Sequence, residues 1–294
     1  HPTRSARTPA TPPDEQHTTA AGWGQRTGGH RSDDNLTALL ISVDQLPQET
    51  LDESHHRVTQ LPIPPVLTTG NKIDGYEVLD VIFSGTRSHM YQVKNLETGQ
   101  HYVLKAPSMN FSEDTVYLDG FIREEWVGQK INHPNVMKTY KPTHAKRFLY
   151  YLGEHIEGMT LRDWMNDHPS PGFDEVRRLA SQIIQGLRAF QRADMLHQDL
   201  KPENIMIDMD SRVKILDFGV AKLGAGTDLT KAGSTVGTTA YMSAEQARGD
   251  TVDARADLWS VGVLFYEMLS GRRPFGGEYE QAVLYAVLNE RPGP

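Results

Sequence analysis

Two kinds of hydrophobic periodicity divide the chain. From Tyr76 to about Ala106, β-branched and aromatic residues alternate with polar ones and are interrupted by turn signals, notably NLETGQ at 95–100. This pattern predicts an antiparallel sheet. After about Thr115 the apolar residues recur with a helical period. The sequence therefore predicts a small lobe built on a sheet, followed by a larger helical lobe.

Two helices are predicted most clearly. The first lies in DEVRRLASQIIQGLRAF, where Asp174 is placed to cap the start. The second lies in ADLWSVGVLFYEMLSG and ends at Gly271, with Pro274 soon after it. In the first helix, seven apolar residues fall on one face, which is the pattern of a helix packed against a core: Val176, Leu179, Ala180, Ile183, Ile184, Leu187 and Phe190.

The N-terminal quarter of the chain differs in composition from the rest. Residues 1–30 are rich in Thr, Pro, Gly, Ala and Arg and have no hydrophobic period, so we expect them to be disordered. Residues 31–45 contain one strand-like apolar run, LTALLISV, and the prolines of 46–75 indicate an extended linker. We place the sheet lobe at 76–155 and the helical lobe at 156–294. Because the chain starts at His1 and not at a methionine, we expect it to be a piece of a longer protein.

Composition limits the classes of function. The 294 residues are 38% hydrophobic, enough for a core, and the formal net charge of −8 argues against a nucleic-acid surface. The absence of cysteine excludes disulfides, thiolate metal sites and cysteine nucleophiles, and is consistent with a reducing, cytoplasmic location. The longest apolar runs are far too short to span a membrane, so we expect no membrane segment.

Candidate chemistry lies in four stretches. HQDLKPEN places Asp199 and Asn204 five residues apart on what we expect to be a loop, since Pro202 interrupts any helix. A carboxylate and an amide at that interval can orient a hydroxyl group and bind a divalent cation. ILDFG places Asp217 at the end of a short apolar strand, where an acid suits a hard ion such as Mg²⁺. YVLK ends at Lys105, which can hold polyphosphate oxygens, and Glu124 on the following helix can pair with that lysine.

Each of these residues has a plainer interpretation. The two aspartates can be turn formers, and Lys105 with Glu124 can be a surface ion pair. We expect His197 to be a structural member of its loop and not a base. His55 and His56 are expected to be solvated linker residues and not metal ligands.

In this order and spacing, Lys105, Glu124, HQDLKPEN and DFG resemble the protein kinase family. Lys201 in DLKPEN resembles the serine/threonine branch of that family. GTTAYMSAE at 237–245 resembles the A-P-E segment, and Asp257 resembles the buried helix acid that anchors the catalytic loop. The resemblance covers about residues 76–294 and implies a bilobal α+β kinase fold. Because the chain ends at NERPGP, we expect the helical lobe to be truncated at its C-terminus.

The resemblance implies a role for each residue. ATP would lie between the lobes, with Lys105 on its α and β phosphates and Glu124 orienting that lysine. Asp217 and Asn204 would hold Mg²⁺ (or Mn²⁺). Asp199 would receive or orient the proton of a serine or threonine hydroxyl on a protein substrate, and Lys201 would stabilise the γ-phosphate.

The phosphate loop departs from the family pattern. In VIFSGTRSHMY, at 81–91, the three glycine positions of the family hold Phe83, Gly85 and Ser88, so only the middle glycine is kept. We expect a stiffer loop and weaker binding of nucleotide. Gly153 falls where the resemblance places the residue at the back of the adenine pocket, so we expect an unusually deep pocket, with Glu154 and His155 forming the hinge.

Further departures concern regulation. Gln198 replaces the usual arginine of the catalytic loop, which puts activation by loop phosphorylation in doubt. Ala244 replaces the proline of A-P-E, and we expect only local rigidity to change. A group of hydroxyl residues after DFG can be phosphorylation sites or part of a flexible polar loop: Thr227, Thr230, Ser234, Thr235 and Thr239.

The front of the chain carries a second, short resemblance. RSDDNLTALLISVD, from Arg31, resembles the last strand of metal-dependent serine/threonine phosphatases, with Asp34 as the metal ligand; the alternative is a plain turn before a strand. We therefore expect an upstream phosphatase domain in the full-length protein, with no phosphatase activity in this chain. For the kinase-like part, the alternative to an enzyme is a pseudokinase that binds nucleotide as a scaffold, or a structural remnant.

Overall fold

The computed structural model describes residues 61–217, 222–223 and 239–293. All of them belong to one compact unit, Glu49–Pro294. The predictions for residues 1–60, including Asp34, His55 and His56, lie outside the described residues. So do four of the candidate phosphorylation sites: Thr227, Thr230, Ser234 and Thr235.

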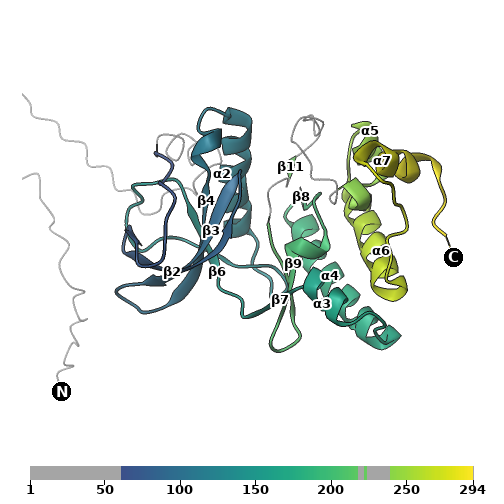
Figure 1. The fold of residues 1–294 in the computed structure, drawn as a ribbon, viewed down its shortest axis with the longest axis horizontal. Coiled ribbons are helices and arrows are strands. Elements are labelled where there is room, and N and C mark those ends of the chain that lie inside the picture. Colours follow the sequence, from purple (N-terminus) through teal and green to yellow (C-terminus); the bar gives the residue numbers. More distant parts are fainter. Residues whose placement is uncertain (1–60, 218–221, 224–238, 294) are drawn as a thin grey trace, which may run out of the picture. The chain divides into compact units, whose positions relative to one another are not determined.

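The predicted sheet is present and has six antiparallel strands (Figure 1). In spatial order they are β1 (Lys72–Ile73), β2 (Tyr76–Ser84), β3 (Ser88–Asn95), β4 (His101–Pro107), β6 (Tyr151–Glu154) and β5 (Thr139–Tyr140). Alternate residues of the long strands point to one buried face, as the period-two pattern predicts. This face forms an aromatic and aliphatic core with Tyr76, Val78, Tyr91, Val93, Tyr102 and Leu104 among its members.

The turn predicted at NLETGQ joins β3 to β4. The Oδ1 atom of Asn95 accepts hydrogen bonds from the backbone N–H groups of Glu97 and Thr98, both at 2.9 Å. Gly99 adopts φ of 72°, which favours glycine. An Asn side chain that bonds to its own following backbone is a standard turn former, so the motif fixes the register of these strands.

The linker expected at 46–75 does not extend through residues 61–75. The backbone N–H of Leu149 donates to the carbonyl of Pro62 at 2.8 Å, and the N–H of Leu67 donates to the hydroxyl of Tyr91 at 3.1 Å. Leu67 and Ile73 are buried in the core of the sheet lobe. The prolines exclude helix but not packing, so this segment belongs to the kinase-like unit.

One long helix accompanies the sheet. A 3₁₀ turn, η2 (Met109–Phe111), leads from β4 to α2 (Thr115–Lys130). Asp114 caps α2, because its side chain accepts a hydrogen bond from the N–H of Tyr117 at 2.9 Å. Figure 1 shows α2 running beside β3 and β4. The helix buries Phe121, Ile122 and, unusually for a charged residue, Glu124.

The second lobe is helical, as predicted. Its helices are α3 (Leu161–Asp167), α4 (Phe173–Arg192), α5 (Ala244–Arg248), α6 (Ala254–Ser270) and α7 (Glu280–Asn289), with 3₁₀ turns η3 (Pro202–Asn204) and η5 (Thr239–Tyr241). Short strands complete it. The sheet β10 (Val213–Ile215), β9 (Ile205–Asp208), β7 (Gly158–Thr160) is accompanied by the pair β11 (Lys222–Leu223) and β8 (Met195–Leu196). The α+β architecture with a sheet lobe and a helical lobe is thereby confirmed.

The two clearest helix predictions differ in their success. Helix α6 ends at Gly271, which adopts φ of 69°, as predicted. The N-cap of α4 lies two residues earlier than predicted, at Gly172 and without a side-chain bond, so Asp174 lies in the first turn of the helix. The ring of Phe173 lies 6.1 Å from that of Phe265 on α6, and this contact favours the earlier start. Ile184 is only partly buried.

None of the helices within the described ranges is long and apolar enough to cross a membrane.

Candidate active site

Three charged residues from distant parts of the chain meet beside the sheet. The Nζ atom of Lys105 lies 2.7 Å from Oε1 of Glu124 and 2.5 Å from Oδ1 of Asp217. The side chain of Lys105 is 12% exposed and that of Glu124 is 5% exposed, so this is no surface ion pair. The structure thus brings together three of the residues that the sequence singled out.

Regular structure positions each member of this cluster. Lys105 is paired with Tyr151 across β4 and β6, and Glu124 lies on the buried face of α2. Asp217 follows β10 and adopts φ of 49°, a conformation that aspartate tolerates better than most residues. The hydroxyl of Tyr151 donates to the same Oε1 of Glu124 at 2.5 Å. Sequence reasoning missed Tyr151, because an aromatic residue on a strand is usually a core residue.

One cation shared by two acids sets the protonation of the cluster. Burial lowers the pKa of Lys105, but the negative charges of Asp217 and Glu124 outweigh burial and raise that pKa well above its ordinary value. Burial raises the pKa of Asp217, but the charge of Lys105 outweighs burial and lowers that pKa to about 2. Burial dominates at Glu124 and raises its pKa to about 7, against the opposing effect of Lys105. Asp217 is therefore the ionised acid, and Glu124 titrates near neutrality.

The loop HQDLKPEN forms a second cluster. The amide Nδ2 of Asn204 donates to the backbone oxygen of Asp199 at 2.9 Å and to its Oδ2 at 3.0 Å. The Nζ atom of Lys201 lies 3.2 Å from the same Oδ2. The carboxylate of Asp199 is thus oriented by two neighbours, as a group that must face a substrate hydroxyl requires.

The local conformation of this loop differs in one respect from the prediction. Pro202 does not prevent helical structure, since it opens the 3₁₀ turn η3, Pro202–Asn204. Proline fits the first position of a helix, because the N–H that it lacks would have no partner there. The turn places Asn204 so that its side chain reaches back to Asp199.

The two clusters lie next to each other. The backbone N–H of Leu216 donates to the carbonyl of Asn204 at 2.8 Å, and the Nε2 atom of His197 lies 2.9 Å from the carbonyl of Leu216. The charge of Lys201 also contributes to the low pKa of Asp217. His197 is fully buried and joins the catalytic loop to the strand that ends before Asp217. Its position is that of a structural residue, as expected.

Asp257, in the first turn of α6, binds the backbone of the loop HQDLKPEN. Its Oδ2 accepts the N–H of His197 at 3.0 Å, and its Oδ1 accepts the N–H of Gln198 at 2.8 Å. Asp257 is 5% exposed, so both bonds are shielded from water. A buried carboxylate satisfied by two backbone N–H groups fixes the path of the loop just before Asp199.

Gln198 has an unusual environment. It adopts φ of 63°, and its carbonyl accepts a hydrogen bond from Nε2 of Gln246 at 2.8 Å. Its own side-chain Oε1 and Nε2 atoms are buried, and among the described residues neither has a hydrogen-bond partner. The backbone N–H of Gln198 is therefore bonded to Asp257, and its carbonyl is bonded to Gln246. Its side chain carries no charge, and among the described residues its amide oxygen and nitrogen have no hydrogen-bond partner.

The segment VIFSGTRSHMY is a tight hairpin between β2 and β3. The N–H of Gly85 donates to the carbonyl of Ser88 at 3.0 Å, which closes the turn and uses one of the amides that a phosphate-binding loop would offer. A Cβ atom on Gly85 would lie 2.5 Å from the far end of the Phe83 ring, so a larger residue at position 85 would require this ring to move. Phe83 itself is 52% exposed.

The space beside Gly153 is next to a buried methionine. Gly153 pairs with Val103 on β4, two residues from Lys105, so it lies on the same face of the sheet as the lysine. A Cβ atom at residue 153 would lie 3.1 Å from Sδ of Met137 and 3.3 Å from its Cε. The buried side chain of Met137 therefore lies directly beside Gly153, and the unusually deep pocket stays a prediction that depends on this side chain. Met137 carried no signal in the sequence, since a lone methionine is usually a core residue.

The two expected hinge residues, Glu154 and His155, directly follow Gly153 in the sequence. The backbone N–H of Glu154 donates to the carbonyl of Lys138 at 2.8 Å, and its carboxylate oxygens lie 2.8 and 2.9 Å from Nζ of Lys214. The rings of His155 and His101 meet edge to face, 6.2 Å apart. The N–H of Glu154 is therefore used within the protein.

The segment before α5 also departs from expectation at one residue. Thr239 is 1% exposed, which does not suit a phosphorylation site in this structure. The replacement of proline by Ala244 is accompanied by a capping box, in which Ser243 and Gln246 bond reciprocally at the start of α5. The cap fixes the start of the helix that proline would otherwise stiffen.

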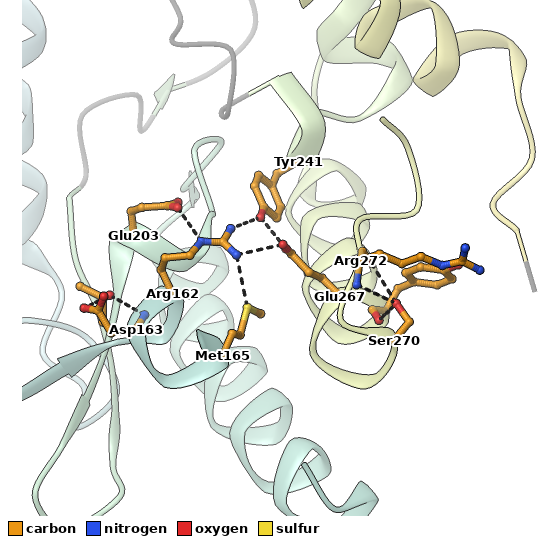
Figure 2. Close-up of polar contacts among 10 residues, drawn as sticks. Arg162, Asp163, Met165, Glu203, Tyr241, Glu267, Ser270 and Arg272 are labelled. Atoms are coloured by element: carbon orange, nitrogen blue, oxygen red, sulfur yellow. Dashed lines mark hydrogen bonds and ion pairs between the residues drawn. The ribbon is translucent and has the colours of Figure 1, made fainter. Parts of the chain in front are cut away.

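A network around Arg162 was not predicted (Figure 2). The guanidinium of Arg162, on α3, donates to Glu203 on η3 at 2.9 Å, to Glu267 on α6 at 2.9 Å and to the hydroxyl of Tyr241 on η5 at 2.6 Å. That hydroxyl donates in turn to Glu267 at 2.5 Å. Glu203 directly precedes Asn204, so the network ties the catalytic loop to three other elements. An arginine with no periodic or motif partner gives no sequence signal for such contacts.

The donor set fits a divalent cation bound together with phosphate. Asp217 is ionised, and Asn204 uses Nδ2 toward Asp199, which leaves its amide oxygen as the available ligand atom. Within the described ranges, no group of three or more His, Asp and Glu side chains is arranged to hold a metal. Hard cations that act on nucleotides are commonly bound by one or two protein groups and completed by phosphates and water.

Comparison with known proteins agrees with this geometry. Residues 76–292 match the protein kinase domain family. The chain is 33% identical over 227 residues to the serine/threonine-protein kinase PknB of Mycobacterium leprae, covering 75% of this chain and 36% of the relative. It is 30% identical over 210 residues to the serine/threonine-protein kinase PrkC of Bacillus subtilis, covering 71% of this chain and 32% of the relative.

The match therefore spans about a third of the length of these curated relatives. The family match extends from the start of β2 to beyond α7 and includes both charged clusters. The chain belongs to the protein kinase domain family, and its curated relatives are bacterial serine/threonine kinases.

Proposed function

We propose that this chain transfers the γ-phosphate of ATP to serine or threonine hydroxyls of protein substrates. The observation that carries the proposal is the meeting of two clusters. Lys105 bridges Glu124 and Asp217, and the adjoining loop presents Asp199 with Lys201 and Asn204. One cluster suits a polyphosphate with its cation, and the other suits a hydroxyl nucleophile.

The residues have distinct roles in this proposal. Lys105 would bind the α and β phosphates in place of its contact with Asp217, while Glu124, itself held by the hydroxyl of Tyr151, keeps its bond to the ammonium group. Asp199 accepts or orients the proton of the substrate hydroxyl, and Lys201 offsets the negative charge of the transferred group. Bound Mg²⁺ (or Mn²⁺), held by Asp217 and Asn204, supplies neutralisation of phosphate charge. Loss of one of these groups should reduce the rate by several orders of magnitude, since catalysis here is positioning and electrostatics.

The test is transfer of labelled γ-phosphate to a generic protein substrate, with Mg²⁺ present. Wild type should label serine and threonine, and Asp199→Asn should reduce the rate at least about a hundredfold while ATP binding is retained. Asp210→Asn is a suitable control, because Asp210 is an exposed acid between β9 and β10 whose ion pair with Arg212 lies at the surface. It should act like wild type.

Two outcomes would contradict the proposal. If wild type binds ATP but transfers no faster than Asp199→Asn, the chain is a nucleotide-binding pseudokinase. If neither protein binds ATP, the site has only a structural role. The retention of Lys105, Glu124, Asp199, Asn204 and Asp217 favours the enzyme over both.

We also propose, from the short resemblance at residues 31–45, that the full-length protein carries a phosphatase domain upstream. These residues lie outside the described ones, so the proposal depends on sequence alone. Phosphatase assay of the full-length protein, with Asp34→Asn as the comparison, tests it. Activity that is unchanged by this substitution would contradict the assignment of Asp34. A cytoplasmic location is a separate proposal, supported by the absence of cysteine from the sequence.

A further inference from the structure

Arg87, in the turn of the β2–β3 hairpin, contacts two aromatic rings that belong to another element. Its guanidinium carbon lies 5.2 Å from the ring centre of Phe111 and 5.1 Å from that of Tyr117. The two rings are themselves 5.1 Å apart. The Nε atom of Arg87 is buried, and in the described part of the chain it has no hydrogen-bond partner. Arg87 as a whole is partly buried, and the two rings cover part of its guanidinium group. Cation–π contacts of this kind become stronger as the cation loses contact with water.

The backbone of Arg87 is fixed to the same segment. Its carbonyl oxygen accepts the hydroxyl of Tyr117 at 2.5 Å and the backbone N–H of Ser108 at 2.7 Å. Ser108 and Phe111 lie at η2, and Tyr117 lies in the first turn of α2. Side chain and main chain of one hairpin residue thus bind the start of the helix, and we call these four residues the hairpin clamp.

The helix end of the clamp leads directly to the charged cluster. Tyr117, Phe121 and Glu124 follow one another at intervals of four and three residues, so they share one face of α2. Phe121 packs against Tyr151, with ring centres 5.4 Å apart, and Glu124 bonds to both Tyr151 and Lys105. A shift of α2 that breaks the Lys105–Glu124 pair must therefore also move Tyr117 and pull on Arg87.

We propose that Arg87 is a positioning residue that couples the hairpin over the phosphates to the Lys105–Glu124 pair through α2. This inference rests on the proposed binding of ATP. A glycine-rich loop moves independently of its surroundings, but this hairpin keeps one glycine of three and is clamped to the helix. Nucleotide held by the hairpin therefore favours the paired state of Glu124, and the paired state favours nucleotide to the same extent, because coupling free energies are reciprocal.

A purely structural role for the clamp makes a different prediction. If Arg87 only stabilises the hairpin, its removal weakens nucleotide binding equally in wild type and in a variant that lacks the carboxylate of Glu124. If it couples the two, its effect depends on Glu124. Effects of independent sites add, whereas those of coupled sites do not, so a double-mutant cycle separates the two roles.

The experiment measures the affinity of MgATP, by calorimetry, for wild type, Arg87→Ala, Glu124→Gln and the double variant. Arg87→Ala should weaken binding about tenfold in wild type but less than about twofold in the Glu124→Gln background, which is within the usual range of coupling. Tyr117→Phe keeps the ring and removes only the hydroxyl bond, so it should give a smaller loss. Lys94→Ala, an exposed lysine on β3 of the same hairpin, is the matched control and should not alter affinity.

The melting temperature of each variant shows whether it is folded under the assay conditions. Equal losses from Arg87→Ala in both backgrounds would overturn the coupling while leaving the proposed kinase function intact. No loss in either background would show that the clamp plays no part in nucleotide binding. Failure of wild type itself to bind MgATP would instead overturn the proposed function on which the inference rests.

Discussion

The backbone N–H of Gln198 donates to Oδ1 of Asp257 at 2.8 Å, although the two residues are 59 positions apart in the sequence. Asp257 accepts the N–H of His197 with its other oxygen. Two consecutive amides of the loop are thus held by one carboxylate from α6, directly before Asp199. The loop that presents the proposed catalytic acid is therefore held by α6 in addition to its own internal bonds from Asn204 to Asp199.

Replacing Asp257 by asparagine should therefore destabilise the protein and slow phosphate transfer. Asparagine keeps one acceptor but points an NH₂ group at the other N–H, so one buried donor loses its partner. We expect a loss of about 2 kcal/mol in the free energy of unfolding, measured by urea denaturation. Asp253→Asn, at the N-cap of the same helix, should leave the free energy of unfolding close to that of wild type, since asparagine also caps helices. Equal losses in the two variants would contradict this account of Asp257.

The raised pKa of Glu124 predicts a pH dependence of stability. Glu124 titrates at about 7 in the folded protein, against an ordinary value of 4.5, so the folded state binds the proton more tightly than the unfolded state does. The contribution of this proton to the stability of the folded state is fully present below pH 4.5 and is lost as the pH rises through 7. Relative to Glu124→Gln, wild type should lose up to about 1.4 kcal/mol of stability per pH unit across this window.

Urea unfolding at several pH values measures that difference. Above pH 7 the curves for wild type and Glu124→Gln should run parallel, because Glu124 is then ionised in both folded and unfolded states. Asp217 has the opposite shift, and its contribution is lost only as the pH falls through about 2, outside the window. A difference that stays constant from pH 4.5 to 7, or that favours wild type as the pH rises, would refute the assignment.

Arg162 should contribute to stability through buried contacts. Its removal leaves Glu267, whose side chain is 9% exposed, without a cation, and leaves the hydroxyl of Tyr241 with one partner fewer. We expect Arg162→Ala to lower the free energy of unfolding by about 2 kcal/mol, discounted for the partial exposure of the arginine. Arg177→Ala removes an exposed pair with Asp174 and should cost less than about 0.5 kcal/mol. Similar effects of the two changes would show that the network in Figure 2 adds nothing beyond a surface pair.

Met137 should limit the size of adenine analogues that the site accepts. Its side chain lies directly beside Gly153, on the face of the sheet that carries Lys105. Met137→Ala should open a cavity there and improve the binding of ADP with a benzyl group on its amino nitrogen, relative to ADP, by about tenfold, or about 1.4 kcal/mol. Met268→Ala, a buried methionine on α6, is the control for general loosening. An unchanged ratio in Met137→Ala would mean that another residue limits the pocket.

Local pattern was sufficient to predict much of this protein. The alternation of 76–106 gives the sheet, and Gly271 ends α6 where the glycine and following proline indicate. The charged residues of the two clusters were found because each stands in a stretch with a recognisable order and spacing. Such features depend on residues close together in sequence, which is why they can be read without the fold.

The remaining features depend on contacts between distant segments. The start of α4 shifts because Phe173 packs on α6, and residues 61–75 pack on the sheet although their prolines suggest a linker. Met137, Arg87 and Arg162 have no periodic partners, and their importance follows only from which rings, carboxylates or empty spaces the fold places beside them. A sequence without alignment contains no local trace of such pairings.

The buried amide of Gln198 has a consequence for how this kinase can change over time. Glutamine and arginine codons differ by a single base, so one mutation can place a guanidinium where Oε1 and Nε2 now lack partners among the described residues. The backbone there is already held by Asp257 and Gln246, so the new cation would start from a loop that needs no rearrangement. A loop that carries no cation beside Asp199 at residue 198 therefore stands one nucleotide change from a loop that carries one.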